Sequence, residues 1–433
     1  MSAAAGQNVA GAVTGIGGLP YNLVFPKHTT AGMNSRLGAL QPYPFQRLAD
    51  LLQGVTPPAH LSPIRLSIGE PQHAAPPFVL EALAASLKGL SQYPVTKGEA
   101  ALRTAIADWA NARFQLTQHP LDPERQVLPV AGTREALFSI AQAVVDRRAH
   151  ADQPVIVMPN PFYQIYEGAA LLSGARPYLL NTTEATRFRM DVARVPEDIW
   201  AQTQLLYVCS PGNPTGTVLT QADFAQLYAL AEKHDFLIAS DECYSEIYFD
   251  EAHPPVGLLQ VAQALGVRDY RRCLVFHSLS KRSNLPGLRS GFVAGDAAVL
   301  EQYLLYRTYQ GCALPPPTQA ASIAAWRDEA HVRDNRAQYR AKFDAVLEIL
   351  APVLDVQRPE AGFYLWPRTP IDEGEFTRRL YAEQNVLVLP GSYLSRHAQG
   401  ENPGARRVRM ALVAPLTQCV EAAQRIRAFL QTL

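Results

Sequence analysis

Short apolar segments alternate with helical segments through the middle of the chain, and this alternation limits the possible folds most strongly. Strands are expected at residues 126–130, 154–158, 175–180, 204–209, 236–240, 273–276 and 291–294. Helical periodicity lies between several of them, for example from 134 to 145. Strands that are apolar throughout are buried on both faces, and helical connections make neighbouring strands parallel. The chain is therefore predicted to have an α/β fold with a mostly parallel sheet.

A second, smaller region follows the three prolines at 315–317. It contains helices at 337–350 and 418–430 and short strands at 363–366, 386–390 and 407–412. This mixture predicts an α+β domain. The expected organisation is a disordered extension at 1–32, an N-terminal arm and helix at 33–65 that belong to the small domain, a large domain at 66–312, and the small domain at 313–433.

Composition excludes several classes of protein. The 433 residues include 39 basic and 39 acidic residues, so nothing favours nucleic acid or an anionic membrane as a partner. No apolar run reaches the length of a membrane helix, and no basic residue precedes Lys27, which argues against a secretory signal. The five cysteines are scattered without a CxxC pair, and the ten histidines have no HxH or HxxxH spacing. We therefore expect a cytoplasmic protein without a disulfide framework or a metal site.

The segment Ser278-Leu279-Ser280-Lys281 follows the strand at 273–276, and Arg289 comes eight residues after the lysine. Open α/β sheets gather their chemistry at the carboxyl ends of strands. A lysine at such a position can form a Schiff base with a carbonyl compound, and the serines and arginine can bind a phosphate. A lone lysine on a polar turn is more often a solvated surface charge. The interpretation therefore depends on what the other strand ends carry.

Three further features fall at expected strand ends. Gly132-Thr133-Arg134 begins a helix, where free N–H groups and the helix dipole can hold an anion. Asn213-Pro214-Thr215-Gly216 has the composition of a turn. Asp241-Glu242-Cys243-Tyr244 places a carboxylate after an apolar strand, where a cationic partner or a helix N-cap role would account for it. Each feature alone has an ordinary structural explanation.

Together and in this order, the four features resemble the class I/II aminotransferases, enzymes of fold type I that use pyridoxal 5′-phosphate (PLP). The resemblance covers residues 34 to 433 and implies a large domain with a seven-stranded sheet. It implies that Lys281 bonds the cofactor as a Schiff base and later carries the proton between the substrate Cα and the cofactor C4′. Asp241 would pair with the pyridinium nitrogen, and Tyr244 and Asn213 would bind the 3′-oxygen. The phosphate would be surrounded by Gly132, Thr133, Arg134, Ser278, Ser280 and Arg289.

The same resemblance implies further binding residues. Tyr163 matches the aromatic residue that stacks on the cofactor ring, with Phe162 as the alternative. Arg409 matches the arginine that grips the substrate α-carboxylate, although Arg406 and Arg407 lie close in sequence. Gly69 and Asn213 would assist in binding that carboxylate. Tyr93 matches a tyrosine that reaches the neighbouring subunit's cofactor phosphate, which implies a homodimer with composite active sites.

Substrate specificity is indicated by residues 34–45, 290–296 and 311–319, which resemble the bacterial succinyldiaminopimelate aminotransferases. The implied reaction converts N-succinyl-LL-2,6-diaminopimelate and 2-oxoglutarate to N-succinyl-2-amino-6-oxopimelate and glutamate, in lysine biosynthesis. An aspartate, kynurenine or alanine aminotransferase, or a PLP-dependent β-lyase, would use similar machinery. Because the succinylated donor carries several carboxylates, additional cations are expected near the site. The candidates are Arg36, Lys97, Arg282 and Arg307, although a solvated surface charge is the more common role for each of them.

Overall fold

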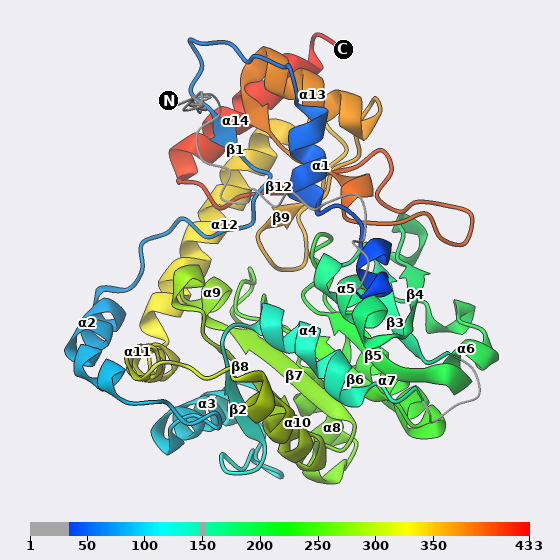
Figure 1. The fold of residues 1–433 in the computed structure, drawn as a ribbon. Helices are drawn as coiled ribbons and strands as arrows, with labels where there is room; N and C mark the ends of the chain where they lie inside the picture. The colour runs from blue at the N-terminus through cyan, green and yellow to red at the C-terminus, as the bar shows by residue number, and fades with distance from the viewer. Residues whose placement is uncertain (1–33, 148–152) are drawn as a thin grey trace, which may run out of the picture.

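The structure is a computed structural model, and it describes residues 34–147 and 153–433 (Figure 1). The extension expected at 1–32 lies outside the described residues. Figure 1 shows a large domain below, built around a sheet, and a smaller domain above, which contains α13 (Glu373–Gln384) and α14 (Leu416–Leu430).

The large domain is built on a seven-stranded sheet, as predicted. Its strands, in spatial order, are β2 (Val127–Val130), β8 (Gly291–Gly295), β7 (Cys273–Ser278), β6 (Leu237–Asp241), β5 (Thr203–Cys209), β3 (Val155–Asn160) and β4 (Arg176–Asn181). β8 pairs antiparallel with both of its neighbours, and the other pairs are parallel. The mostly parallel sheet is therefore confirmed, and the ends of β5, β6 and β7 lie side by side.

Both faces of this sheet are covered because successive strand residues point to opposite sides. On β5, Leu205 and Tyr207 belong to one hydrophobic core, whereas Leu206 and Val208 belong to another. The first core is completed by α4 (Thr133–Val144), α5 (Gln164–Ser173) and α10 (Ala297–Gln310). The second is completed by α3 (Ala100–Arg113), α6 (Glu197–Gln202), α7 (Gln221–His234), α8 (Leu258–Ala264) and α11 (Pro316–Arg327).

The small domain contains the long helix α12 (Ala330–Leu350) together with α13 and α14. Both α12 and α13 contact α14. Its three-stranded sheet has the order β11 (Leu389–Pro390), β12 (Val408–Ala411) and β9 (Tyr364–Leu365), and β1 (Ile64–Arg65) pairs parallel with β10 (Val386–Leu387). Helix α1 (Pro44–Leu51) places Leu48 in a cluster with Trp366 and Leu389. These contacts join the N-terminal arm to the small domain.

Helix α11 packs against the large domain, although the sequence assigned it to the small domain. It contacts α2 (Pro77–Ala85) and α3, and its Ala321, Ala325 and Trp326 lie in the core of the large domain. The prolines that begin α11 interrupt the chain without changing the domain to which it belongs. We therefore propose that the small domain begins after α11 rather than at residue 313.

Candidate active site

Lys281 lies where β7 passes into the short helix α9 (Leu279–Arg282). The Ser278 hydroxyl accepts a hydrogen bond from the Ser280 N–H at 3.1 Å and so caps this helix. The Nζ of Lys281 donates to the carbonyl of Gly69 at 2.5 Å. Burial lowers the pKa of the Lys281 amine from its ordinary 10.5 to about 8. An amine with this pKa is uncharged more often near neutral pH and is a better nucleophile.

Asp241 ends β6, the strand next to β7, and its side chain is buried. The Tyr166 hydroxyl donates to Oδ2 at 2.6 Å, and the Cys243 N–H donates to Oδ1 at 3.3 Å. Burial raises the pKa of the Asp241 carboxyl, although these hydrogen bonds oppose the shift. A buried carboxylate held by neutral donors is suited to a cationic N–H ligand. Tyr166 was not predicted from the sequence; its position one helical turn after Tyr163 was the available signal.

Tyr244 and Gly69 meet at a second residue that the sequence did not reveal, Tyr364. The hydroxyls of Tyr244 and Tyr364 are 3.0 Å apart. A Cβ on Gly69 would lie 2.0 Å from the Tyr364 hydroxyl, so a side chain at position 69 is excluded unless Tyr364 moves. This close approach brings the Gly69 backbone into the same site as Tyr244 and Lys281.

Arg409 reaches this site from β12 in the small domain. Its Nη1 donates to Asn213 Oδ1 at 3.0 Å and its Nη2 donates to the Ser67 carbonyl at 2.8 Å. The guanidinium lies over the Tyr364 ring, 4.5 Å from the ring centroid. The buried Nε has no hydrogen-bond partner among the residues that the structure describes. A fixed guanidinium of this kind can bind a carboxylate.

The neighbouring arginines point elsewhere. Arg407 donates to the Trp366 carbonyl at 2.9 Å and to Glu184 Oε2 at 2.8 Å. Arg406 donates from its side chain to the Pro370 carbonyl. Of the three, Arg409 is the arginine brought to Asn213.

Four of the six residues expected at a phosphate lie at the start of α4, where Gly132, Thr133 and Arg134 begin the helix and Arg289 contacts Gly132. Gly132 has φ +87°, and the position of a Cβ there would lie 2.1 Å from Arg289 Nη2. The guanidinium of Arg289 thus lies against the glycine backbone, beside the first free N–H groups of the helix. The hydroxyls of Ser278 and Ser280 are 2.9 Å apart. Helix N–H groups, hydroxyls and a guanidinium are the donors that hold a phosphate.

Tyr163, predicted to contact the ring, and the predicted phosphate residues Thr133 and Arg134 have the following partners. The Tyr163 hydroxyl accepts from Arg134 Nε at 2.6 Å, while Thr133 places its hydroxyl 3.0 Å from the Cys243 sulfur. Phe162, the alternative to Tyr163, is buried in the core. Tyr163 is only partly buried, so its ring is the more accessible of the two.

Tyr93 stands apart from these residues. Its relative exposure is 102%, and no hydrogen bond or ring contact links it to the site in the part of the chain described here. A single chain therefore leaves this side chain facing outward.

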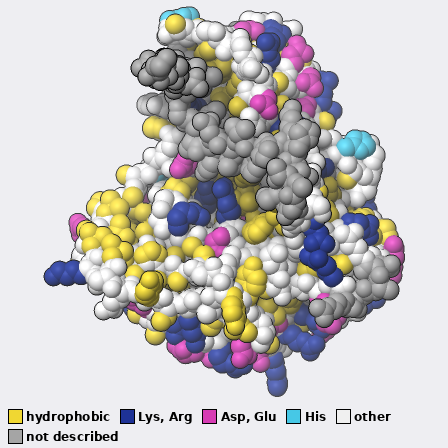
Figure 2. All heavy atoms as spheres, in the orientation of Figure 1, with side chains coloured by type: hydrophobic (Ala, Val, Ile, Leu, Met, Phe, Trp, Pro, Cys, Tyr) yellow, Lys and Arg dark blue, Asp and Glu magenta, His cyan; other side chains and the backbone are white. Residues whose placement is uncertain are grey.

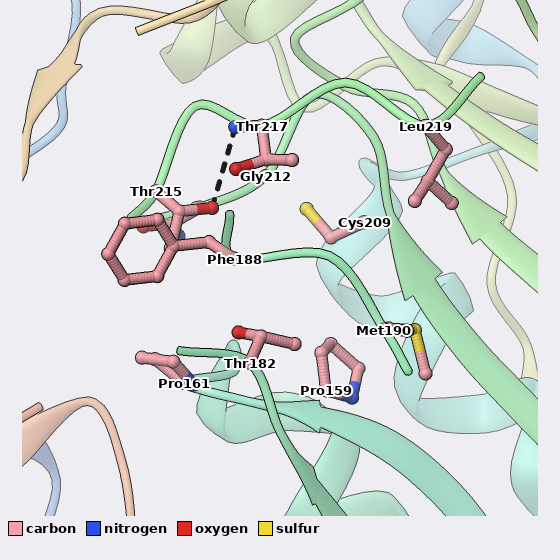
Figure 3. A pocket seen from close by; sticks show the side chains of 11 residues that line it. Pro159, Pro161, Thr182, Phe188, Met190, Cys209, Gly212, Thr215, Thr217 and Leu219 are labelled. Carbon is pink, nitrogen blue, oxygen red and sulfur yellow. Dashed lines mark hydrogen bonds between the residues drawn. The ribbon is translucent and has the colours of Figure 1, made fainter. Parts of the chain in front are cut away.

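A small cavity lies beside Asn213. Figure 3 shows the Cys209 sulfur pointing into it, with Phe188 and Thr215 on one side and Met190 on another. Thr215 Oγ1 accepts from the Thr217 N–H at 3.5 Å, which closes the turn. The turn that carries Asn213 thus borders a small cavity with a mixed lining of apolar and hydroxyl side chains.

Three of the four cations expected to bind additional carboxylates are paired elsewhere. Buried Arg282 pairs with Glu329, buried Arg307 pairs with Glu135 at 2.8 Å, and Lys97 pairs with Glu124 at 3.0 Å. Acids from elsewhere in the fold therefore hold these three candidates, and sequence position does not reveal which acid lies across the fold. Arg36, in the 3-10 helix Ser35–Ala39, has no ion pair within the described ranges. Figure 2 shows Lys and Arg side chains gathered between the two domains, an arrangement that attracts anions.

The residues fit a phosphorylated aldehyde cofactor: an amine of lowered pKa, a buried carboxylate and a phosphate cradle lie at one end of the sheet. Among the described residues, no cluster of three or more His, Cys, Asp or Glu side chains could hold a metal ion. No helix in residues 34–147 or 153–433 is long and apolar enough to cross a membrane.

Comparison with known proteins agrees with this fit. The family model for aminotransferase class I and II matches residues 62–426. The LL-diaminopimelate aminotransferase of Desulforudis audaxviator is 31% identical over 403 residues, covering 90% of this chain and 96% of the relative. The crystal structure of an aminotransferase from Neisseria meningitidis is 48% identical, with a TM-score of 0.87, and covers 92% of this chain and 100% of that one. A probable N-succinyldiaminopimelate aminotransferase from Thermus thermophilus is 27% identical, with a TM-score of 0.77, and covers 89% and 99%. The chain therefore belongs to the class I and II aminotransferases, which use pyridoxal 5′-phosphate.

Proposed function

We propose that the enzyme transfers an amino group from N-succinyl-LL-2,6-diaminopimelate to 2-oxoglutarate, forming N-succinyl-2-amino-6-oxopimelate and glutamate. The single observation that carries the amino-transfer chemistry is the Lys281 amine, whose pKa burial lowers to about 8 beside Tyr244 and Gly69. An amine of this kind combines with an aldehyde cofactor and then exchanges protons near neutral pH.

The proposed roles at the cofactor are those that the family resemblance implies, and the positions described above support them. Bound PLP supplies an electron sink for the substrate Cα. Lys281 Nζ holds the cofactor between turnovers and moves the proton at Cα when substrate is bound. Asp241 keeps the ring nitrogen protonated, because a buried carboxylate with a raised pKa gains most from an N–H⁺ partner. Tyr244 and Asn213 bind the 3′-oxygen.

The phosphate and the ring have separate proposed sets of contacts. The α4 N-terminus supplies backbone donors to the phosphate, the guanidinium of Arg289 supplies charge, and Tyr163 covers the ring. The complete phosphate set proposed is Gly132, Thr133, Arg134, Ser278, Ser280 and Arg289.

The substrate α-carboxylate is assigned to Arg409, with Asn213 and the Gly69 N–H beside it. Support comes from the Arg409 guanidinium, which is fixed by Asn213 and Ser67 but retains an unpaired Nε. An arginine already held in place loses little side-chain freedom when its guanidinium binds a carboxylate.

The identity of the amino donor is the most specific part of the proposal. The succinylated donor is supported by the resemblance to succinyldiaminopimelate aminotransferases in residues 34–45, 290–296 and 311–319. The Thermus relative, a probable N-succinyldiaminopimelate aminotransferase, also supports it. Arg36, a cation without an ion pair in the described ranges, is the candidate contact for the succinyl carboxylate. Free LL-diaminopimelate is the second candidate, because several relatives that are 28–31% identical bear that name.

The two donors differ in charge at the distal end. The succinyl group replaces an ammonium by an amide and adds a carboxylate, so a cation favours the succinylated donor and an acid favours the free one. The measurement is kcat/KM with 2-oxoglutarate for both diaminopimelates, aspartate, kynurenine and alanine. Fastest turnover of N-succinyl-LL-2,6-diaminopimelate supports the proposal, whereas preference for any other donor contradicts it. Release of ammonia without glutamate would identify a β-lyase instead.

A homodimer in the cytoplasm is part of the same proposal. Leu87, Leu90, Tyr93 and Val95 form an exposed run, and Leu305 and Tyr309 are exposed on α10. Exposed apolar groups of this size are characteristic of interfaces. Tyr93 would then reach the cofactor phosphate of the partner subunit, so that each site is completed by both chains.

A further inference from the structure

Lys342 is a buried lysine without an acidic partner. The residue is 2% exposed and forms no ion pair in the described part of the chain. Its Nζ donates to His73 Nε2 at 2.6 Å and to the Val413 carbonyl at 3.2 Å, and it lies 5.0 Å from the centroid of the Tyr339 ring. Burial lowers the pKa of Lys342 to about 8. Because a buried cation with neutral partners costs stability, its placement calls for a functional explanation.

The hydrogen bonds donate successively from Lys342 to His73 and from His73 to Asn335. A lysine ammonium can only donate, so His73 Nε2 accepts and its Nδ1 carries the proton. Nδ1 then donates to Asn335 Oδ1 at 2.7 Å. Burial, together with the charge on Lys342, lowers the pKa of His73, in agreement with a neutral ring. The amide of Asn335 is therefore left with its NH₂ group facing the other way.

That NH₂ group points at the helix of the candidate catalytic lysine. Asn335 Nδ2 donates to the carbonyl of Lys281 at 3.2 Å and to that of Arg282 at 3.3 Å. Helix α9 has only four residues, so its last carbonyls have no partner within the helix. Asn335 supplies these carbonyls with a donor and fixes the end of α9.

The same network reaches the Lys281 amine from the other side. His73 follows Gly69 by four residues, and the Gly69 carbonyl accepts from Lys281 Nζ. Aromatic contacts run alongside: Tyr339 stacks on Phe363 with centroids 5.5 Å apart, and the Phe363 centroid lies 5.3 Å from Lys281 Nζ. The Gly69 carbonyl thus holds the side chain of Lys281, and Asn335 holds its backbone carbonyl. His73 connects the two, because it lies on the Gly69 segment and donates to Asn335.

Helix α12 carries three members of this arrangement on one face, because Asn335, Tyr339 and Lys342 are spaced by four and three residues. Figure 1 shows α12 running from the small domain down toward α11 and α9. We propose that Lys342, His73 and Asn335 form a positioning network that sets the orientation of Lys281 through α9 and the Gly69 loop. The proposal deepens the proposed function and rests on the role assigned there to Lys281.

The test uses the PLP-loaded enzyme and three variants. Lys342→Met removes the donor and the charge but keeps the side-chain length, and Asn335→Ala removes the contact to α9. Arg340→Met is the matched control, since Arg340 is a partly exposed cation of α12 that pairs with Glu251 instead. For each protein, the visible absorbance is titrated with pH, kcat/KM is measured, and circular dichroism checks the fold.

Both network variants are expected to move the midpoint of the absorbance titration by about 0.5 to 1 pH unit, the size of effect that one lost hydrogen bond produces. Their kcat/KM should fall about tenfold or more through misplacement of the amine. Arg340→Met should change neither quantity. The midpoint separates positioning of Lys281 from a general loss of stability, which would lower the amount of active enzyme without moving the midpoint.

Outcomes for the two proposals are distinguishable. A wild-type enzyme without a pH-dependent visible band would overturn the role of Lys281 and this network with it. A wild-type band whose midpoint is unchanged in a folded Asn335→Ala or Lys342→Met variant would overturn the network alone. A midpoint shift of equal size in Arg340→Met would also overturn it, because a cation outside the network would then have the same effect.

Discussion

The guanidinium of Arg289 lies in the space that a side chain on Gly132 would need: Nη2 is 2.1 Å from the position of a Cβ there. The two residues come from different segments, one at the start of α4 and the other eight residues after Lys281. Their contact places a positive charge against the free N–H groups of a helix. Any side chain at position 132 must displace the arginine from the proposed phosphate cradle.

Gly132→Ala is therefore expected to weaken PLP binding. The substitution displaces Arg289 and strains a backbone at φ +87° and ψ 148°, so the PLP dissociation constant should rise about tenfold or more. Titration of the cofactor-free protein with PLP measures this. Gly311→Ala is the control, since Gly311 has φ +80° at the end of α10 and nothing within 4 Å of a Cβ. Equal PLP affinity in both variants would contradict the proposed cradle.

Arg409→Gln should reduce kcat/KM for every amino donor by about 10² to 10³-fold, the effect of losing two charge-assisted hydrogen bonds to the α-carboxylate. Arg407→Gln provides the comparison, because Arg407 contacts Glu184 and the Trp366 carbonyl rather than Asn213. Steady-state kinetics on both variants distinguish the two arginines. A larger loss of kcat/KM in Arg407→Gln than in Arg409→Gln would contradict the assignment, because Arg407 would then be the arginine that binds the α-carboxylate.

The cofactor-free protein should gain stability at neutral pH when Lys281 is replaced. The amine has a pKa of about 8 when folded and 10.5 when unfolded, so the unfolded state binds more protons between these values. The free energy of unfolding therefore rises with pH across this window, and the full cost of burying the ammonium is present below pH 8. Lys281→Met should raise the free energy of unfolding at pH 7 by about 1–3 kcal/mol, allowing for partial exposure.

Urea denaturation of wild type and Lys281→Met at pH 7 and pH 10 measures this difference. Other titrating groups cancel in the comparison, so the stabilisation should shrink at the higher pH. A variant less stable than wild type at pH 7, or a difference independent of pH, would contradict the lowered pKa.

Tyr93 should act in the partner subunit's site. Inactive Lys281→Ala and Tyr93→Ala proteins, mixed after dissociation at limiting PLP, should recover about a quarter of wild-type activity, because half of the dimers would contain one complete site. The proteins remixed without dissociation are the control. No recovery would mean that Tyr93 serves its own chain or no site.

The sequence revealed the parts of the fold that depend on local pattern. Strands such as β5 and β6 are largely apolar and are followed by polar motifs, so Asn213 and Asp241 could be located before the structure was known. The small domain predicted from residue 313 includes α11, whereas residues of α11 pack in the core of the large domain. A run of prolines interrupts a chain without showing where the following helix packs.

Contacts between distant segments were not predictable in the same way. Tyr166 and Tyr364 look like ordinary core aromatics until they are found at Asp241 and Tyr244. Lys342 has the spacing of a normal helix face, and only the fold brings it to His73. Arg282 was one of the candidate cations for the substrate, but it is buried against Glu329. That acid lies 47 residues along the chain, so no local pattern reveals the pair.

Chemical trapping of the cofactor tests the assignment of Lys281 most directly. The PLP-saturated enzyme is reduced with borohydride, digested, and the peptides are identified by mass spectrometry. We expect a single pyridoxyl-modified residue, Lys281, because its amine alone combines a lowered pKa with contacts to Gly69 and Tyr244 among the site residues named above. Modification of another lysine, or a wild-type enzyme that reduction leaves unmodified, would contradict it.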